Sequence, residues 1–238
     1  MFSIKSLPRV TKVNTKSNLS LLRLLHIQTF TTPNENALKF QIDQKILDDD
    51  VSSIQINQLN QSISPLASKI FQYSKDVESL MIGSNFITVN KDEFTHWNQV
   101  TPLIKTILEN HIENNEDIII AQSSNPAKQP HHDEHYAALS EEDQEISDLI
   151  SELIETKIRP TIQEDGGDLI FMRYSEGKVY VQLQGACTSC SLSDDTLKSG
   201  IQGMLNHYID GIDEVVNLAE VEFNKFEEKL KASKEARA

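Results

Sequence analysis

Residues 179–201 read VYVQLQGACTSCSLSDDTLKSGI and contain the only two cysteines of the 238-residue chain, Cys187 and Cys190. The first part of this stretch alternates apolar with polar residues, and that period of two predicts a β-strand. From Leu197 onward apolar residues recur at helical spacing, which predicts an amphipathic helix. The sequence therefore places a CxxC motif on the turn between a strand and a helix.

The elements around this turn predict an α+β domain at residues 140–221. Its first helix should begin at Ser140, which starts an N-cap box. That helix is expected to end near Arg159 and Pro160, because the residue before a proline avoids helical angles. The expected strands are Leu169–Tyr174, Val179–Leu183 and Glu214–Leu218. The predicted order is helix, hairpin, CxxC, helix and strand, followed by an exposed helical tail at residues 222–238.

Another small α+β domain is predicted upstream, at residues 27–121. Its expected strands are Ala37–Ile42, Val77–Met81 and Phe86–Val89. One helix should open at Ser64 and Pro65, since proline is tolerated in the first helical turn. A second helix carries Trp97 and an apolar stripe, and we expect both in the core. Residues 122–139 break both periods and form a flexible polar linker between the two domains.

The first 28 residues carry five basic side chains, no acidic one and many Ser and Thr residues. This composition is typical of a mitochondrial transit peptide, which we place at residues 1–26, and it predicts a protein of the mitochondrial matrix. Without the leader, 17 basic and 36 acidic residues remain, a net charge near −19. Such an acidic chain is not expected to bind nucleic acid, because phosphate contacts need clustered Lys and Arg. No apolar run reaches the roughly 18 residues that span a membrane.

The CxxC spacing alone is compatible with zinc, thiol–disulfide exchange or an iron–sulfur cluster. A helix N-terminus favours thiolate, which is both ligand and nucleophile. Zinc and iron–sulfur clusters are each bound by four ligands, and this chain has two cysteines. His207 is predicted about four helical turns from the cysteines, too far to bind the same metal. A cluster shared across a homodimer is therefore the simplest way to complete the four ligands. Thioredoxin-like exchange would need a strand–helix–strand unit with parallel strands, and the predicted hairpin argues against that surround.

Other candidate ligands have simpler interpretations. The linker histidines can bind metal weakly, but we expect a solvated linker. These residues are His131, His132 and His135. Acidic side chains also surround Gly166 and Gly167, and we expect them to stabilise a tight turn rather than to form a metal or acid–base site. These residues are Glu164, Asp165 and Asp168. No Gly-rich phosphate loop follows a strand, so a nucleotide-dependent enzyme is not expected.

Several motifs together carry a family resemblance. Those of the second domain are Ile158-Arg159-Pro160, Gln163-Glu164-Asp165-Gly166-Gly167-Asp168, Leu183-Gln184-Gly185-Ala186-Cys187-Thr188-Ser189-Cys190 and Thr196-Leu197-Lys198-Ser199-Gly200-Ile201. They resemble the C-terminal domain of NifU over about residues 140–220. Those of the first domain are Thr32-Pro33-Asn34, Leu38-Lys39-Phe40, Ser64-Pro65-Leu66-Ala67, Phe86-Ile87-Thr88-Val89 and Trp97. They resemble the Nfu N-terminal domain, and the order of domains is similar to that of mitochondrial Nfu-type iron–sulfur scaffolds.

The resemblance implies a non-enzymatic scaffold and carrier that holds a [4Fe–4S] cluster between two subunits, with Cys187 and Cys190 as ligands. It further implies supply by upstream cluster-assembly factors and delivery to apo-proteins such as lipoate synthase and aconitase-like or respiratory enzymes. Many relatives have proline after the second cysteine, where this chain has Ser191. A thiol–disulfide oxidoreductase and a zinc-bridged interaction module remain the alternatives.

Overall fold

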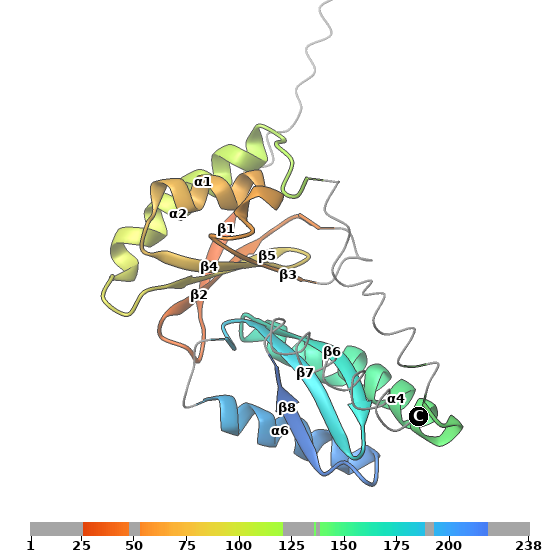
Figure 1. Ribbon diagram of the computed structural model, residues 1–238. Coiled ribbons are helices and arrows are strands. Elements are labelled where there is room, and N and C mark those ends of the chain that lie inside the picture. The colour runs from red at the N-terminus through yellow and green to blue at the C-terminus, as the bar shows by residue number, and fades with distance from the viewer. Residues whose placement is uncertain (1–25, 48–52, 121–135, 137–138, 189–192, 219–238) are drawn as a thin grey trace, which may run out of the picture.

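The computed structural model describes residues 26–47, 53–120, 136, 139–188 and 193–218. The predictions for the leader, most of the linker with its three histidines, Cys190, Ser191 and the C-terminal tail lie outside the described residues. The described part forms two sheets with helices against them (Figure 1). None of the helices in that part combines the length and the hydropathy needed to cross a membrane.

The first domain is a five-stranded antiparallel sheet in the order β1-β2-β5-β4-β3. Its elements are β1 (Ile27–Thr31), β2 (Ala37–Ile42), β3 (Ile54–Asn57), the 3-10 turn η1 (Gln61–Ile63), α1 (Pro65–Tyr73), β4 (Val77–Ile82), β5 (Phe86–Lys91) and α2 (Trp97–Glu113). Both helices lie on one face of the sheet (Figure 1). Alternate apolar residues of the strands pack there against the helices, because successive side chains of a strand point to opposite faces.

Helix α1 begins as its sequence predicts. Ser64 accepts a hydrogen bond from the N–H of Ala67 at 3.1 Å, and Pro65 occupies the first turn, where its missing N–H is not needed. The predicted strands β2, β4 and β5 are confirmed, whereas the sequence did not reveal β1 and β3. Trp97 packs only partly against the core, and its indole N–H donates to Glu35 O at 2.9 Å.

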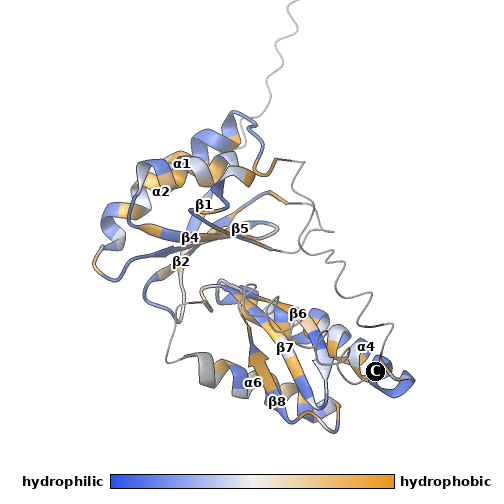
Figure 2. Ribbon diagram, in the orientation of Figure 1, coloured by the Kyte–Doolittle hydropathy of each residue, from blue (hydrophilic) through white to orange (hydrophobic). Residues whose placement is uncertain are grey.

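The second domain contains a three-stranded sheet in the order β6-β7-β8. Its elements are α4 (Glu141–Leu153), the π-helix η2 (Ile154–Ile158), α5 (Arg159–Glu164), β6 (Gly167–Ser175), β7 (Lys178–Gly185), α6 (Ser193–Tyr208) and β8 (Glu214–Asn217). The N-cap at Ser140 is confirmed by the hydrogen bond from Asp143 N–H to Ser140 Oγ. Figure 2 shows hydrophobic residues along β8 and the β6–β7 hairpin. Some of them line the core of this domain, and Met172 and Tyr180 form a separate small cluster with Ile170, Val216 and Leu218.

The prediction that the first helix ends near Arg159 and Pro160 is wrong. The chain stays helical to Glu164, since the π-helical segment Ile154–Ile158 connects α4 directly to α5. Pro160 is the second residue of α5 and directly follows the π-helical turn, in which the Arg159 N–H donates to Ile154 O.

Candidate metal centre

Cys187 lies on a tight turn at the end of β7. Gly185 has a φ of +64°, a left-handed value that favours glycine. The N–H of Cys187 donates to Gln184 O at 3.3 Å, and the N–H of Thr188 donates to Gly185 O at 3.2 Å. Cys187 itself is half-buried and packs against the core of the second domain. The turn therefore holds the thiol at the edge of the core, with part of it open.

Two glycines shape the space beside this thiol, each for its own reason. Gly166 has a φ of +77°, so the predicted tight turn is confirmed. Gly167 matters through its missing side chain, since a Cβ there would lie 2.2 Å from Cys187 Sγ and 3.0 Å from a methyl of Ile162. The sulfur thus occupies the space that any larger residue at position 167 would need.

The two cysteines remain predicted ligands, because Cys190 lies outside the described residues. Helix α6 begins at Ser193, three positions after it. His207 is exposed in the last turn of α6, about 20 Å along the helix from its start at 1.5 Å per residue, and its ring packs edge-on against Tyr208. The described residues contain no group of three or more His, Cys, Asp or Glu side chains that could hold a metal ion.

Asp168 forms a buried ion pair rather than stabilising the turn as expected. Its side chain is fully buried, and Arg159 Nε and Nη2 both donate to it at 2.9 Å. Gln163, the Leu169 N–H and Ser53 Oγ also donate to the same carboxylate. The hydrogen bonds that Arg159 donates to Asp168 raise the pKa of Arg159. The carboxylate is fully engaged in holding α5 against β6, so it is not an acid–base or metal group.

The prediction that the CxxC lacks a strand–helix–strand surround is wrong. Strands β7 and β8 are parallel neighbours, and α6 is the connection between them. The CxxC therefore precedes the crossover helix of a β7–α6–β8 unit. The order of elements along the chain did not reveal this arrangement, because it does not state which strands pair. The surround consequently gives no reason to reject thiol–disulfide exchange.

Side chains of the first domain also reach the cysteine turn, and sequence reasoning missed them. Asn34 Nδ2 donates to Ala186 O at 3.0 Å, and Gln55 Oε1 accepts the Gly185 N–H at 2.9 Å. These partners are more than 100 positions apart in the chain. Neither residue lies in a strand that the sequence predicted, so no signal pointed to them.

Comparison with known proteins gives two family matches. Residues 27–115 match the family described as scaffold protein Nfu/NifU N terminal, and residues 150–216 match the NifU-like domain. A mitochondrial NifU-like protein of Saccharomyces cerevisiae is 44% identical over 91% of this chain and 92% of its own length. The mitochondrial NFU1 iron–sulfur cluster scaffold homolog of Drosophila willistoni is 35% identical over 92% of this chain and 76% of its own. The solution structure of a NifU-like protein from S. cerevisiae covers 49% of this chain with 37% identity and a TM-score of 0.40.

Proposed function

Because the chain belongs to the mitochondrial NifU-like family of iron–sulfur cluster scaffolds, we propose that Cys187 and Cys190 bind the cluster it carries. The observation that carries this proposal is the position of Cys187, half-exposed on the turn between β7 and α6. Thiolates on a short turn present their sulfur to a cluster without burying it, which suits a cargo that must later leave. The protein acts in mitochondria as a scaffold, and we place it in the matrix.

The proposed cargo is a [4Fe–4S] cluster shared by two chains. Such a cluster is held by four cysteine thiolates. One chain supplies two, and no described group of side chains supplies the others. Two copies of the CxxC turn complete the set, so the cluster and the homodimer should form together.

Delivery follows from the same geometry. Dissociation of the dimer removes half of the ligands at once, so an apo-protein that offers more cysteines in one site should take the cluster by thiol exchange. The formal net charge of −14 favours acceptors and upstream assembly factors with basic patches, and salt should slow their encounter. Lipoate synthase and aconitase-like or respiratory enzymes are the acceptors to test first.

The test is anaerobic reconstitution followed by iron and sulfide analysis and sedimentation. The chain should change from monomer to dimer and hold about four iron atoms per dimer. Cys187→Ser and Cys190→Ser should each abolish both properties, whereas the matched control His207→Ala should retain them. A stoichiometric cluster on a monomer, or a loss caused by His207→Ala, would contradict the shared site.

Thiol–disulfide exchange is a second candidate, favoured by the parallel β7–α6–β8 surround of the motif. It predicts that the metal-free chain reduces a protein disulfide and that Cys187→Ser abolishes this activity. A zinc-bridged module predicts instead a colourless dimer with one zinc. If the reconstituted protein is colourless and reduces disulfides at a catalytic rate, the oxidoreductase replaces the scaffold reading of the two thiols.

A further inference from the structure

The first domain has a second sheet face, turned away from α1 and α2, that carries four polar side chains and one methionine. Gln55, Met81, Thr88 and Lys39 are directly opposite one another across β3, β4, β5 and β2, and Asn90 lies on the same face. We call these five residues the clamp face. An antiparallel sheet commonly leaves such a face in water. Here Thr88 is 0% and Asn90 2% exposed, because the second domain covers them.

One part of the clamp face holds the segment that leads into β6. Lys39 Nζ donates to Gln163 O at 2.7 Å, and Thr88 Oγ1 donates to Gly166 O at 2.6 Å. Both acceptors are backbone carbonyls. Burial lowers the pKa of Lys39. The segment they hold ends at Gly167, the residue against which Cys187 Sγ packs.

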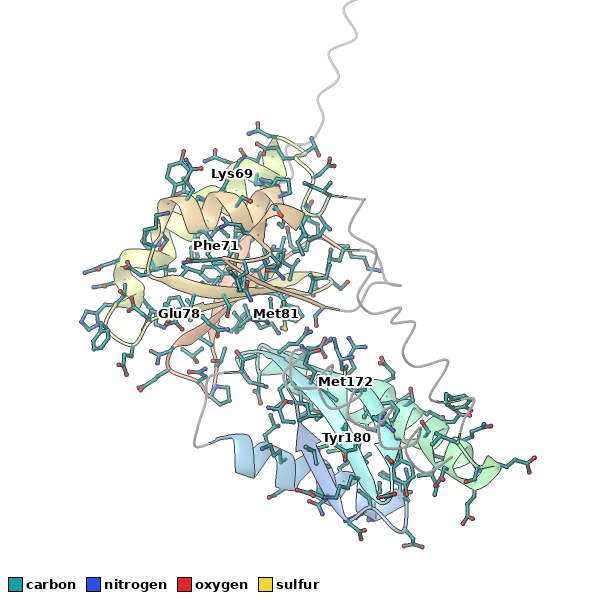
Figure 3. The ribbon with its side chains drawn as sticks, viewed as in Figure 1. Lys69, Phe71, Glu78, Met81, Met172 and Tyr180 are labelled. Carbon is teal, nitrogen blue, oxygen red and sulfur yellow. The ribbon has the colours of Figure 1, made fainter. Side chains whose placement is uncertain are left out.

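The other part of the clamp face holds the end of β7. Asn90 Nδ2 donates to Gly185 O at 3.1 Å, and Gln55 Oε1 accepts the N–H of the same residue. Met81, labelled in Figure 3 on the side of the sheet that faces the second domain, lies so close that a Cβ on Gly185 would be 2.7 Å from its sulfur. Gly185 is two positions before Cys187. The first domain therefore holds two backbone segments near the thiol, the turn before β6 and the end of β7.

These contacts give the first domain a specific role. Each of these carbonyls already accepts a backbone N–H of the second domain, from Gly166, Ala186 and Thr188 in turn. The clamp face adds a second hydrogen bond to each carbonyl and so ties the two segments to the first domain. Since each partner is a side chain of a separate domain, all of them can be exchanged for water in one opening motion. While the face is engaged, the turn keeps one conformation and Cys187 stays half-buried.

We propose that the first domain clamps the cysteine turn through this face and thereby sets how often Cys187 is open to reaction. The consequence for cargo rests on the proposed function, in which Cys187 is a cluster ligand. The opening itself is a property of the metal-free chain and can be measured without iron.

The test is the alkylation rate of Cys187 by N-ethylmaleimide in the full-length, metal-free chain. A Cys190→Ser background leaves Cys187 as the single thiol. The double variant Lys39→Met/Thr88→Val removes the two donors with little change of volume. Each net hydrogen bond is worth about a factor of five in an opening equilibrium, so we expect alkylation to accelerate at least about tenfold.

The matched control is Lys69→Met/Thr106→Val, which makes the same two chemical changes on α1 and α2. Lys69 on α1 pairs with Glu116, which follows α2, and Thr106 Oγ1 donates to Pro102 O within α2. The control should alkylate within about twofold of the parent rate, because the hydrogen bonds it loses do not contact the cysteine turn. A folded Lys39→Met/Thr88→Val protein that alkylates no faster than the control overturns the proposal.

A second measurement covers the case in which the double variant does not fold. Gln55 is only half-buried on an edge strand, so Gln55→Met is expected to fold. It removes the acceptor of the Gly185 N–H, and hydrogen exchange at that amide should accelerate about fivefold. Unchanged exchange overturns the clamp. Neither readout involves a cluster, so failure of the clamp is distinguishable from failure of reconstitution.

Discussion

Replacement of Asp168 by Asn should destabilise the second domain strongly while leaving its shape intact. The carboxylate accepts five hydrogen bonds, two of them from Arg159 at 2.9 Å. An amide keeps one accepting oxygen and turns an NH₂ group toward donors, so at least two donors lose their acceptor. The cation of Arg159 also loses its only fully buried counter-charge among the described contacts.

The magnitude follows from burial. Breaking a buried ion pair by removing one partner costs about 3–5 kcal/mol. The Arg159 side chain is 14% exposed and keeps Glu155, which is itself 57% exposed, so the lower end applies. A loss of about 3 kcal/mol in a domain of this size lowers the melting temperature by about 12–24 °C. Marginal stabilities of about 5–15 kcal/mol make this a large fraction of the total.

The assay is thermal and urea unfolding of the full chain, monitored by circular dichroism. The matched control is Glu155→Gln, the same carboxylate-to-amide change on the exposed side of Arg159, which should cost under about 1 kcal/mol. If Asp168→Asn costs no more than Glu155→Gln, the pair does not hold α5 against β6 and the reasoning fails.

Three further predictions concern single positions. Gly167→Ala should force the Cys187 side chain to rotate, which should reduce iron uptake in reconstitution and lower stability by about 1–3 kcal/mol. Unchanged iron uptake would contradict the close packing of Cys187 Sγ on Gly167. Burial lowers the pKa of His111 below its unfolded value of about 6.5, so below that pH the unfolded chain binds one more proton than the folded chain and stability should fall. The urea midpoint of His111→Gln should depend less on pH in this range, and an equal dependence in both proteins would refute the argument. Glu176 has a φ of +50° beside Gly177, so Glu176→Asn should raise stability by about 0.5–1 kcal/mol in thermal unfolding, whereas Glu176→Val should lower it.

The local features of this protein were determined by the sequence itself. Ser64 and Pro65 mark the start of α1, and the pair Glu176-Gly177 turns the β6–β7 hairpin, because caps and tight turns depend on neighbouring residues only. The motifs that place the chain in its family, with Cys187 on the turn after β7, were equally legible. The roles of Cys190 and of the shared cluster stay predictions.

Tertiary structure alone decided what depends on residues far apart in the chain. The parallel pairing of β8 with β7 could not be read from the order of elements, and neither could the burial of Thr88 under the second domain. The polar alternation of β2 and β5 is the same whether a face meets water or the backbone of another domain. Only the folded chain, by bringing Thr88 to the carbonyl of Gly166, distinguishes a solvated face from one that holds the cysteine turn.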